Sequence, residues 1–112
     1  MAAYLLETHG VEVHHVDRAG ADLWCKLGHG IVTVQVKSCS APKQVGDKGQ
    51  SYYTYCTPPS DPDYYAFVAL DRELLVIKPN DQDAIKSTTR IMAQEFNATN
   101  QRRSIRAMLE TT

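Results

Sequence analysis

One aspartate and a Gln-x-Lys triplet lie close together in the N-terminal half of the chain. Asp22 falls in the run 20–25, and Gln35-Val36-Lys37 ends the run 31–37. A carboxylate, an amide oxygen and a lysine, brought together at the end of a strand, can hold Mg²⁺ against a phosphodiester. The first candidate chemistry is therefore metal-assisted hydrolysis of a phosphodiester bond.

Two strand-like runs must position these side chains. Residues 20–25 and 31–37 are rich in branched and aromatic residues, and glycines punctuate the turn between them. In the second run three valines alternate with polar residues that include Gln35 and Lys37, so the valines can be buried on one face. If the two runs pair as a hairpin, Asp22 can lie beside Gln35 and Lys37.

The motif resembles the signature of the PD-(D/E)XK nuclease superfamily. In that family an aspartate is followed by a strand that carries Glu-x-Lys or, in some branches, Gln-x-Lys. This chain departs from the pattern twice. The residue before Asp22 is Ala21 rather than proline, and the position of the middle acid is occupied by the neutral Gln35. We expect the loss of that charge to weaken metal binding.

A second resemblance lies in the C-terminal part of the chain. The stretches 87–91 (Ser-Thr-Thr-Arg-Ile) and 100–106 (Asn-Gln-Arg-Arg-Ser-Ile-Arg) are similar to the C-terminal pattern of the branch that includes group I intron homing endonucleases. The segment Asp63-Tyr64-Tyr65-Ala66 and the run 73–79 lie between the two motifs as they do in that branch. The resemblance implies a small restriction-endonuclease-like α/β core, in which helices flank a central mixed β-sheet.

The resemblance also implies a role for each residue of the motif. Asp22, Gln35 and Lys37 would be catalytic. Asp22, the Gln35 amide oxygen and the Val36 carbonyl would hold Mg²⁺, for which Mn²⁺ can substitute. Lys37 would orient or deprotonate the attacking water, or hold the scissile phosphate. Many of these enzymes carry a further glutamate on the first helix; the one candidate here is Glu7, which we expect to be a solvated helix residue.

Length and composition limit the alternatives. The chain has 112 residues, which favours one domain over residues 1–112 that includes the basic tail 84–112. No apolar run approaches the ~20 residues that span a bilayer, and the N-terminus has no signal-peptide pattern, so we expect a cytoplasmic protein without a membrane partner. Three cysteines without CxxC spacing argue against a disulfide framework or a zinc site.

The distribution of charge is more informative than the net charge of −1. Residues 61–83 are acidic, whereas the tail and the loop 38–50 are basic, so the loop and the tail can flank a DNA backbone. The candidate DNA contacts are Arg18, Lys43, Lys48, Gln101, Arg102, Arg103 and Arg106. The alternatives are an ordinary solvated surface or, for the tail, ion pairs within an oligomer. One active site cuts one strand, so cleavage of both strands predicts a homodimer or a higher symmetric oligomer.

Periodicity and turn residues predict the remaining elements. We expect a helix over 1–9 closed by Gly10, strands over 11–16, 51–57, 64–70 and 73–78, and a loop over 38–50. A helix is predicted from about residue 82, on the spacing of Ile85, Thr88, Thr89 and Met92, although part of this stretch would be extended if the homing-endonuclease resemblance holds. A last helix is predicted over 104–109.

Three functional hypotheses follow. The first is a Mg²⁺-dependent DNA endonuclease that resembles homing endonucleases; Holliday junction resolvases and other structure-specific nucleases share its core motif. The second is a PD-(D/E)XK fold that binds double-stranded or branched DNA without cutting it, which the missing proline and the neutral Gln35 favour. The third is a small α/β domain in which the motif is coincidental.

Overall fold

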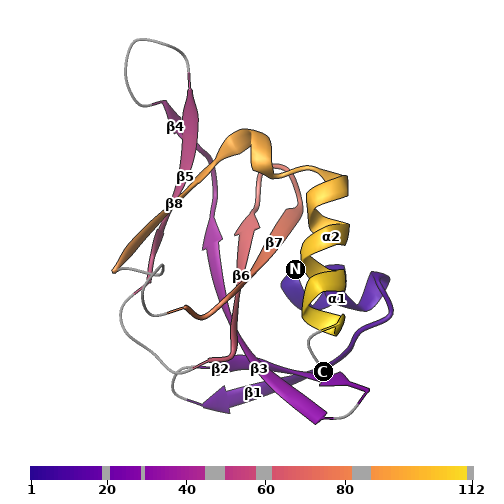
Figure 1. Ribbon diagram of the computed structural model, residues 1–112. Coiled ribbons are helices and arrows are strands. Elements are labelled where there is room, and N and C mark those ends of the chain that lie inside the picture. Colours follow the sequence, from indigo (N-terminus) through magenta and orange to yellow (C-terminus); the bar gives the residue numbers. More distant parts are fainter. Residues whose placement is uncertain (19–20, 29, 45–49, 58–61, 82–86, 111–112) are drawn as a thin grey trace.

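The computed structural model describes residues 1–18, 21–28, 30–44, 50–57, 62–81 and 87–110. These residues form, in order, α1 (Ala2–Thr8), β1 (Glu12–Arg18), β2 (Ala21–Leu27), β3 (Gly30–Cys39), β4 (Lys43–Gln44), β5 (Ser51–Cys56), β6 (Tyr64–Ala69), β7 (Leu74–Pro79), β8 (Thr88–Met92), the 3-10 helix η1 (Ala93–Glu95) and α2 (Ala98–Glu110) (Figure 1). None of the helices in these ranges is both long and apolar enough to cross a bilayer.

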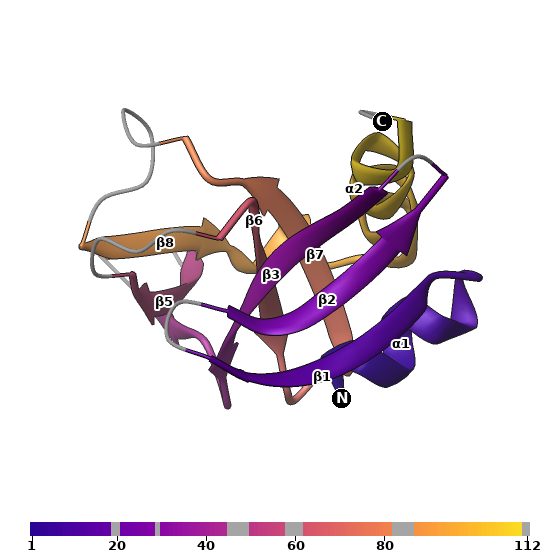
Figure 2. The ribbon, with the colours of Figure 1, turned by 90° about the horizontal axis from the view of Figure 1, so that it is seen from below.

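Two sheets organise the described part of the chain. The larger has five strands in the order β1-β2-β3-β6-β7, and it is mixed because β3 and β6 run parallel while its other neighbours are antiparallel. The smaller has three antiparallel strands in the order β4-β5-β8. The prediction of an α/β fold with a mixed central sheet is confirmed. The helices α1 and α2 cover one face of the large sheet, and the smaller sheet covers the other (Figure 2).

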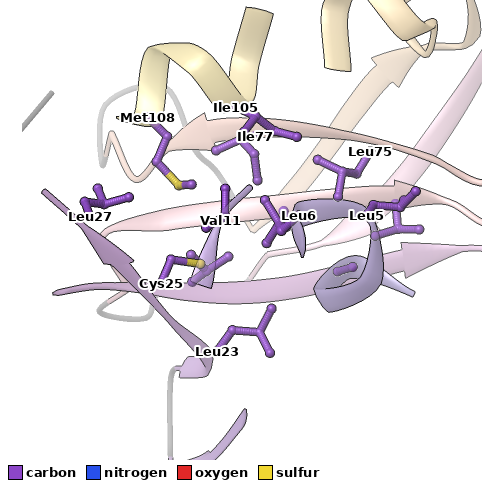
Figure 3. Close-up of a cluster of buried hydrophobic side chains, with 14 residues drawn as sticks. Leu5, Leu6, Val11, Leu23, Cys25, Leu27, Leu75, Ile77, Ile105 and Met108 are labelled. Carbon is purple, nitrogen blue, oxygen red and sulfur yellow. The ribbon is translucent and has the colours of Figure 1, made fainter. Parts of the chain in front are cut away.

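The helix side of the large sheet holds the first core. Leu6 of α1 and Ile105 and Met108 of α2 are almost completely buried beside Leu75 of the sheet (Figure 3), in a cluster that also includes Val34. In α2 the buried residues recur at helical spacing, which gives the helix one apolar face and leaves its arginines exposed. The α1 helix ends as predicted, because Gly10 follows it with a φ of 81°, a conformation that glycine adopts without a steric penalty.

The second core lies between the two sheets and is aromatic. Tyr53 and Tyr55 of β5 meet Tyr65 and Phe67 of β6, with the rings of Tyr55 and Phe67 4.9 Å apart. Both buried hydroxyls have partners: that of Tyr53 donates to the Asp71 carboxylate at 2.7 Å, and that of Tyr55 donates to the Val68 carbonyl at 2.9 Å. The tyrosine-rich strand is therefore a core strand, and its rings hold the smaller sheet to the larger one.

The outer edge of β7 is covered by side chains of α2. The Oε1 atom of Gln101 accepts the Leu75 N–H at 2.9 Å, and the Ser104 hydroxyl accepts the Ile77 N–H at 3.0 Å. Gln101 is only 6% exposed. This corrects the expectation that Gln101 contacts DNA, because its side chain is used inside the fold to satisfy a strand edge.

Three stretches differ from the predicted elements. Thr88–Met92 is the extended strand β8, paired with β5, so the helical spacing of this stretch is misleading and the extended alternative holds; residues 82–86 lie outside the described ranges. The predicted loop 38–50 begins as strand, because β3 continues to Cys39, and Lys43 and Gln44 pair with Tyr52 and Ser51. Directly before α2, the Asn97 side chain accepts the Asn100 N–H at 2.9 Å, and the helix starts at Ala98 rather than at the predicted residue 104.

Candidate functional site

The β2–β3 hairpin brings the aspartate to the Gln-x-Lys triplet. Leu23 pairs with Val34, and continuing this register by one residue sets Asp22 opposite Gln35. Leu23 and Val34 point into the helix-side core, so Asp22 and Gln35 lie on the face that the smaller sheet covers. The expected hairpin is therefore present, with the polar side chains on the face opposite the helices.

A hydrogen bond anchors the Asp22 carboxylate to the triplet. Its Oδ2 atom accepts the Val36 N–H at 2.8 Å. The backbone pairing of β2 with β3 ends at Leu23 and Val34, so the Asp22 side chain takes the place of the next backbone acceptor. The carboxylate is thereby fixed beside the peptide that links Gln35 to Val36.

The Val36 carbonyl faces the same side as this carboxylate. In a strand, the N–H and C=O of one residue are directed to the same neighbouring strand, as in the paired exchange of an antiparallel ladder. The Val36 N–H points to Asp22, and the Val36 carbonyl is therefore directed to that side of β3 as well. One carboxylate and one backbone carbonyl therefore lie on the same side of β3, just beyond its pairing with β2.

Gln35 and Lys37 lie along the row of aromatic residues in β6. Gln35 pairs with Tyr65 and Lys37 pairs with Phe67, and both polar side chains are half-buried. Across the described ranges, Lys37 forms no ion pair with an acid. Its stem can pack beside Phe67 while the ammonium remains available to an external anion.

The donor set fits Mg²⁺ better than zinc. Asp22, the Gln35 amide and the Val36 carbonyl offer oxygen atoms, the ligands that Mg²⁺ prefers, and the Oδ2 bond to Val36 leaves the second carboxylate oxygen of Asp22 for a cation. Nowhere in the described residues do three His, Cys, Asp or Glu side chains converge. A metal held here would thus have one anionic ligand and neutral oxygens.

The basic residues predicted to contact DNA are divided between two sides of the sheet. Lys43 is exposed on β4, in the layer that covers the same face as Gln35. Arg102, Arg103 and Arg106 are exposed on α2, which packs on the opposite face. Arg102 and Arg106 line a groove of about 190 Å³ together with His9. Arg18 ends β1, but its side chain is outside the described part, as is Lys48.

Other side chains near the hairpin can now be placed. Trp24 pairs with Thr33, two residues along the hairpin from the Asp22–Gln35 position, and its indole N–H is buried without a hydrogen-bond partner in the described ranges. Glu7 is exposed on α1, as expected for a solvated residue. Asp63, which no sequence pattern marked as a site residue, accepts the N–H of Thr33, two residues before Gln35. The sequence feature that could have indicated a role for Asp63 is its position directly before the strand β6.

The fold, rather than the sequence, connects this chain to a known protein. The sequence matches no protein-family model and no curated protein. The fold is similar to that of the bacterial homing endonuclease I-Ssp6803I, with a TM-score of 0.70 and 20% sequence identity over 98% of this chain and 84% of that chain. At this identity the likeness shows a shared fold. The chain is thus a small α/β protein with the fold of a bacterial homing endonuclease.

Proposed function

We propose that this chain is a Mg²⁺-dependent DNA endonuclease of the PD-(D/E)XK type, closest to the group I intron homing endonucleases. The observation that carries the proposal is the 2.8 Å hydrogen bond from the Val36 N–H to Asp22, because it holds a carboxylate beside the Gln-x-Lys strand. The fold shared with a homing endonuclease supports the same function at the level of architecture.

Three oxygen donors would hold the metal: the Asp22 carboxylate, the Gln35 amide and the Val36 carbonyl. The chemistry that Mg²⁺ supplies when bound is activation of water and neutralisation of charge on the phosphodiester, and Mn²⁺ can replace it. The bond to Val36 restricts rotation of the Asp22 carboxylate, so this ligand is oriented before a metal arrives. The neutral Gln35 contributes an oxygen but no charge.

Lys37 would act on the substrate side of the site. It follows Gln35 by two residues on the same face of β3, and no acid of the described chain neutralises it. As an ammonium it would bind an oxygen of the scissile phosphate. As a base it would instead take a proton from the attacking water. We assign to Lys43 a phosphate that flanks the cut, since Lys43 lies on the same side of the large sheet.

Cleavage of both strands of a duplex requires two such sites. One chain supplies one Asp22–Gln35–Lys37 set in its described residues. We therefore propose a homodimer or a higher symmetric oligomer as the active form on double-stranded DNA.

The test compares cleavage of supercoiled, linear and four-way-junction DNA in Mg²⁺ by the wild-type chain, Asp22→Ala and Lys37→Ala. Lys26→Ala is the matched control, since Lys26 is an exposed lysine on the adjacent strand. We expect both site variants to lose at least a hundredfold in rate while Lys26→Ala keeps wild-type activity.

Each other outcome has a defined meaning. Equal cleavage by the wild type and both site variants would remove the enzyme hypothesis. Cleavage of the junction alone would favour a structure-specific nuclease such as a Holliday junction resolvase. DNA binding without cleavage by the wild type would favour the non-catalytic DNA-binding alternative.

A further inference from the structure

Asp63 is tied to Thr33 of β3 by both its side chain and its backbone. Its Oδ2 atom accepts the Thr33 N–H at 2.8 Å and the Thr33 hydroxyl at 3.2 Å. Its own N–H donates to the Thr33 carbonyl at 3.0 Å and to the Thr33 hydroxyl at 3.0 Å. Asp63 stands directly before β6, so its carboxylate caps a strand N–H that β6 itself does not reach.

This contact mirrors the one that Asp22 makes. Asp22 accepts the Val36 N–H from the β2 side of β3, and Asp63 accepts the Thr33 N–H from the β6 side. Both distances are 2.8 Å. The segment from Thr33 to Val36, which contains Gln35, is therefore held from both sides by aspartate side chains.

Asp63 is itself fixed from the other direction. The Asn80 N–H, just beyond β7, donates to the Asp63 carbonyl at 3.0 Å, and the Asn80 side-chain amide donates to the Pro62 carbonyl at 2.8 Å. A continuous chain of hydrogen bonds thus runs from the end of β7 through Asp63 to Thr33. Such a chain can fix the position of β3, the strand that carries the triplet, relative to β6 and β7.

We propose that Asp63 is a positioning residue: by accepting the Thr33 N–H it sets the position of the Thr33–Val36 segment, and with it Gln35 and the Val36–Asp22 contact. The inference rests on the proposed function for its catalytic meaning, although the positional effect exists without metal or DNA. The acceptor atom, not the charge, is the feature required. Asparagine at position 63 can supply an acceptor, whereas alanine cannot.

Amide hydrogen exchange followed by NMR, without metal, tests this role. In Asp63→Ala we expect exchange about tenfold faster or more at both Thr33 and Val36, and little change at Phe67 and Leu75 in the core. Asp63→Asn should remain close to the wild type. A purely local cap would alter Thr33 alone, so unchanged exchange at Val36 would overturn the proposal.

Two further variants complete the design. Asp71→Ala is the matched control, because Asp71 is an exposed aspartate beyond the other end of β6 that accepts one side-chain hydrogen bond. It should leave Thr33 and Val36 unchanged; faster exchange at these two amides would show general loosening and overturn the specific role of Asp63. If Asp63→Asn behaves like Asp63→Ala, the charge rather than the acceptor matters, and the proposal is overturned as well.

A separate titration keeps the two proposals distinguishable. Trp24 is the one tryptophan of the chain and lies beside the candidate metal site, so Mn²⁺ binding can be followed by quenching of its fluorescence. Asp22→Ala should weaken Mn²⁺ binding about tenfold or more. Equal binding by the wild type and Asp22→Ala would count against the metal site, whereas the exchange experiment would still decide the role of Asp63.

Discussion

The Oε1 atom of Gln101 accepts the backbone N–H of Leu75 at 2.9 Å, so a helix side chain completes the hydrogen bonding of an edge strand. Ser104, three residues further along α2, does the same for Ile77. Through these bonds α2 covers the open edge of the large sheet. Gln101 thus has a structural role inside a basic stretch whose arginines, Arg102, Arg103 and Arg106, are exposed.

The first prediction concerns this edge. Gln101→Leu should lower the free energy of unfolding by about 1–3 kcal/mol, because it leaves the buried Leu75 N–H without its acceptor. Urea unfolding measures the change. Gln94→Leu is the control, since Gln94 is exposed on η1. Equal midpoints for Gln101→Leu and the wild type would show that water replaces the lost bond.

The central hairpin and the β6–β7 pair could be predicted from sequence. Alternation of valines with Thr33, Gln35 and Lys37 identifies both the strand and its buried face, because the side-chain period of a strand is fixed by geometry. The tyrosines of β5 also indicate a strand. Local patterns of this kind are sufficient where burial on one face is all that the strand requires.

Long-range pairing explains what the sequence did not reveal. Thr88–Met92 contains apolar and polar residues at helical spacing, but it is extended because it pairs with β5, more than thirty residues earlier. The structural role of Gln101 depends on β7 lying beside α2. For the site, the Asp22 contact followed from the hairpin, whereas the Asp63 contact required the parallel pairing of β3 with β6.

The second prediction tests the neutral residue of the triplet. Gln35→Glu should lower the Mg²⁺ concentration for half-maximal cleavage about tenfold, because a second carboxylate adds charge to the metal site. We expect a millimolar requirement in the wild type. Gln44→Glu, which adds the same charge on exposed β4, is the control for general electrostatics. A tighter requirement in the wild type than in Gln35→Glu would contradict Gln35 as a ligand.

The third prediction separates the two basic surfaces. Lys43→Ala should weaken DNA binding and reduce the slope of log affinity against log salt by about 0.9, the value for one lost phosphate contact. Arg106→Ala should leave this slope unchanged, because α2 lies on the sheet face opposite Gln35 and Lys37. Both affinities are measured without divalent metal, so that the DNA is not cut during the titration. The reverse order would place the DNA on the helix side.

The fourth prediction concerns the thiols. Burial raises the pKa of Cys25 from 9.0 to about 11, whereas Cys56 is exposed. Because the thiolate is the reactive form, a disulfide reagent at pH 8 should modify Cys56 rapidly and Cys25 only as the protein unfolds. Cys56→Ser should remove the fast phase. Cys39, which is half-buried, is the other thiol that could react early. A fast phase that persists when both Cys56 and Cys39 are replaced by serine would contradict this order.

The fifth prediction concerns stability at high pH. Burial, reinforced by the hydrogen bond to the Asp71 carboxylate, raises the pKa of Tyr53 from 10.0 to about 12. Between pH 10 and 12 the unfolded chain has lost this proton and the folded chain retains it. The raised pKa therefore adds to the free energy of unfolding in full below pH 10. Between pH 10 and 12 this contribution falls by about 1.4 kcal/mol per pH unit.

Tyr53→Phe isolates that contribution. The variant keeps the ring in the aromatic core but removes the titrating hydroxyl, so it should be about 1 kcal/mol less stable at pH 8 and should lose less stability between pH 10 and 11.5. Urea unfolding at several pH values gives both quantities. Tyr4→Phe is the control, because Tyr4 is 66% exposed. Parallel pH profiles for Tyr53→Phe and the wild type would show that Tyr53 already titrates normally in the folded state.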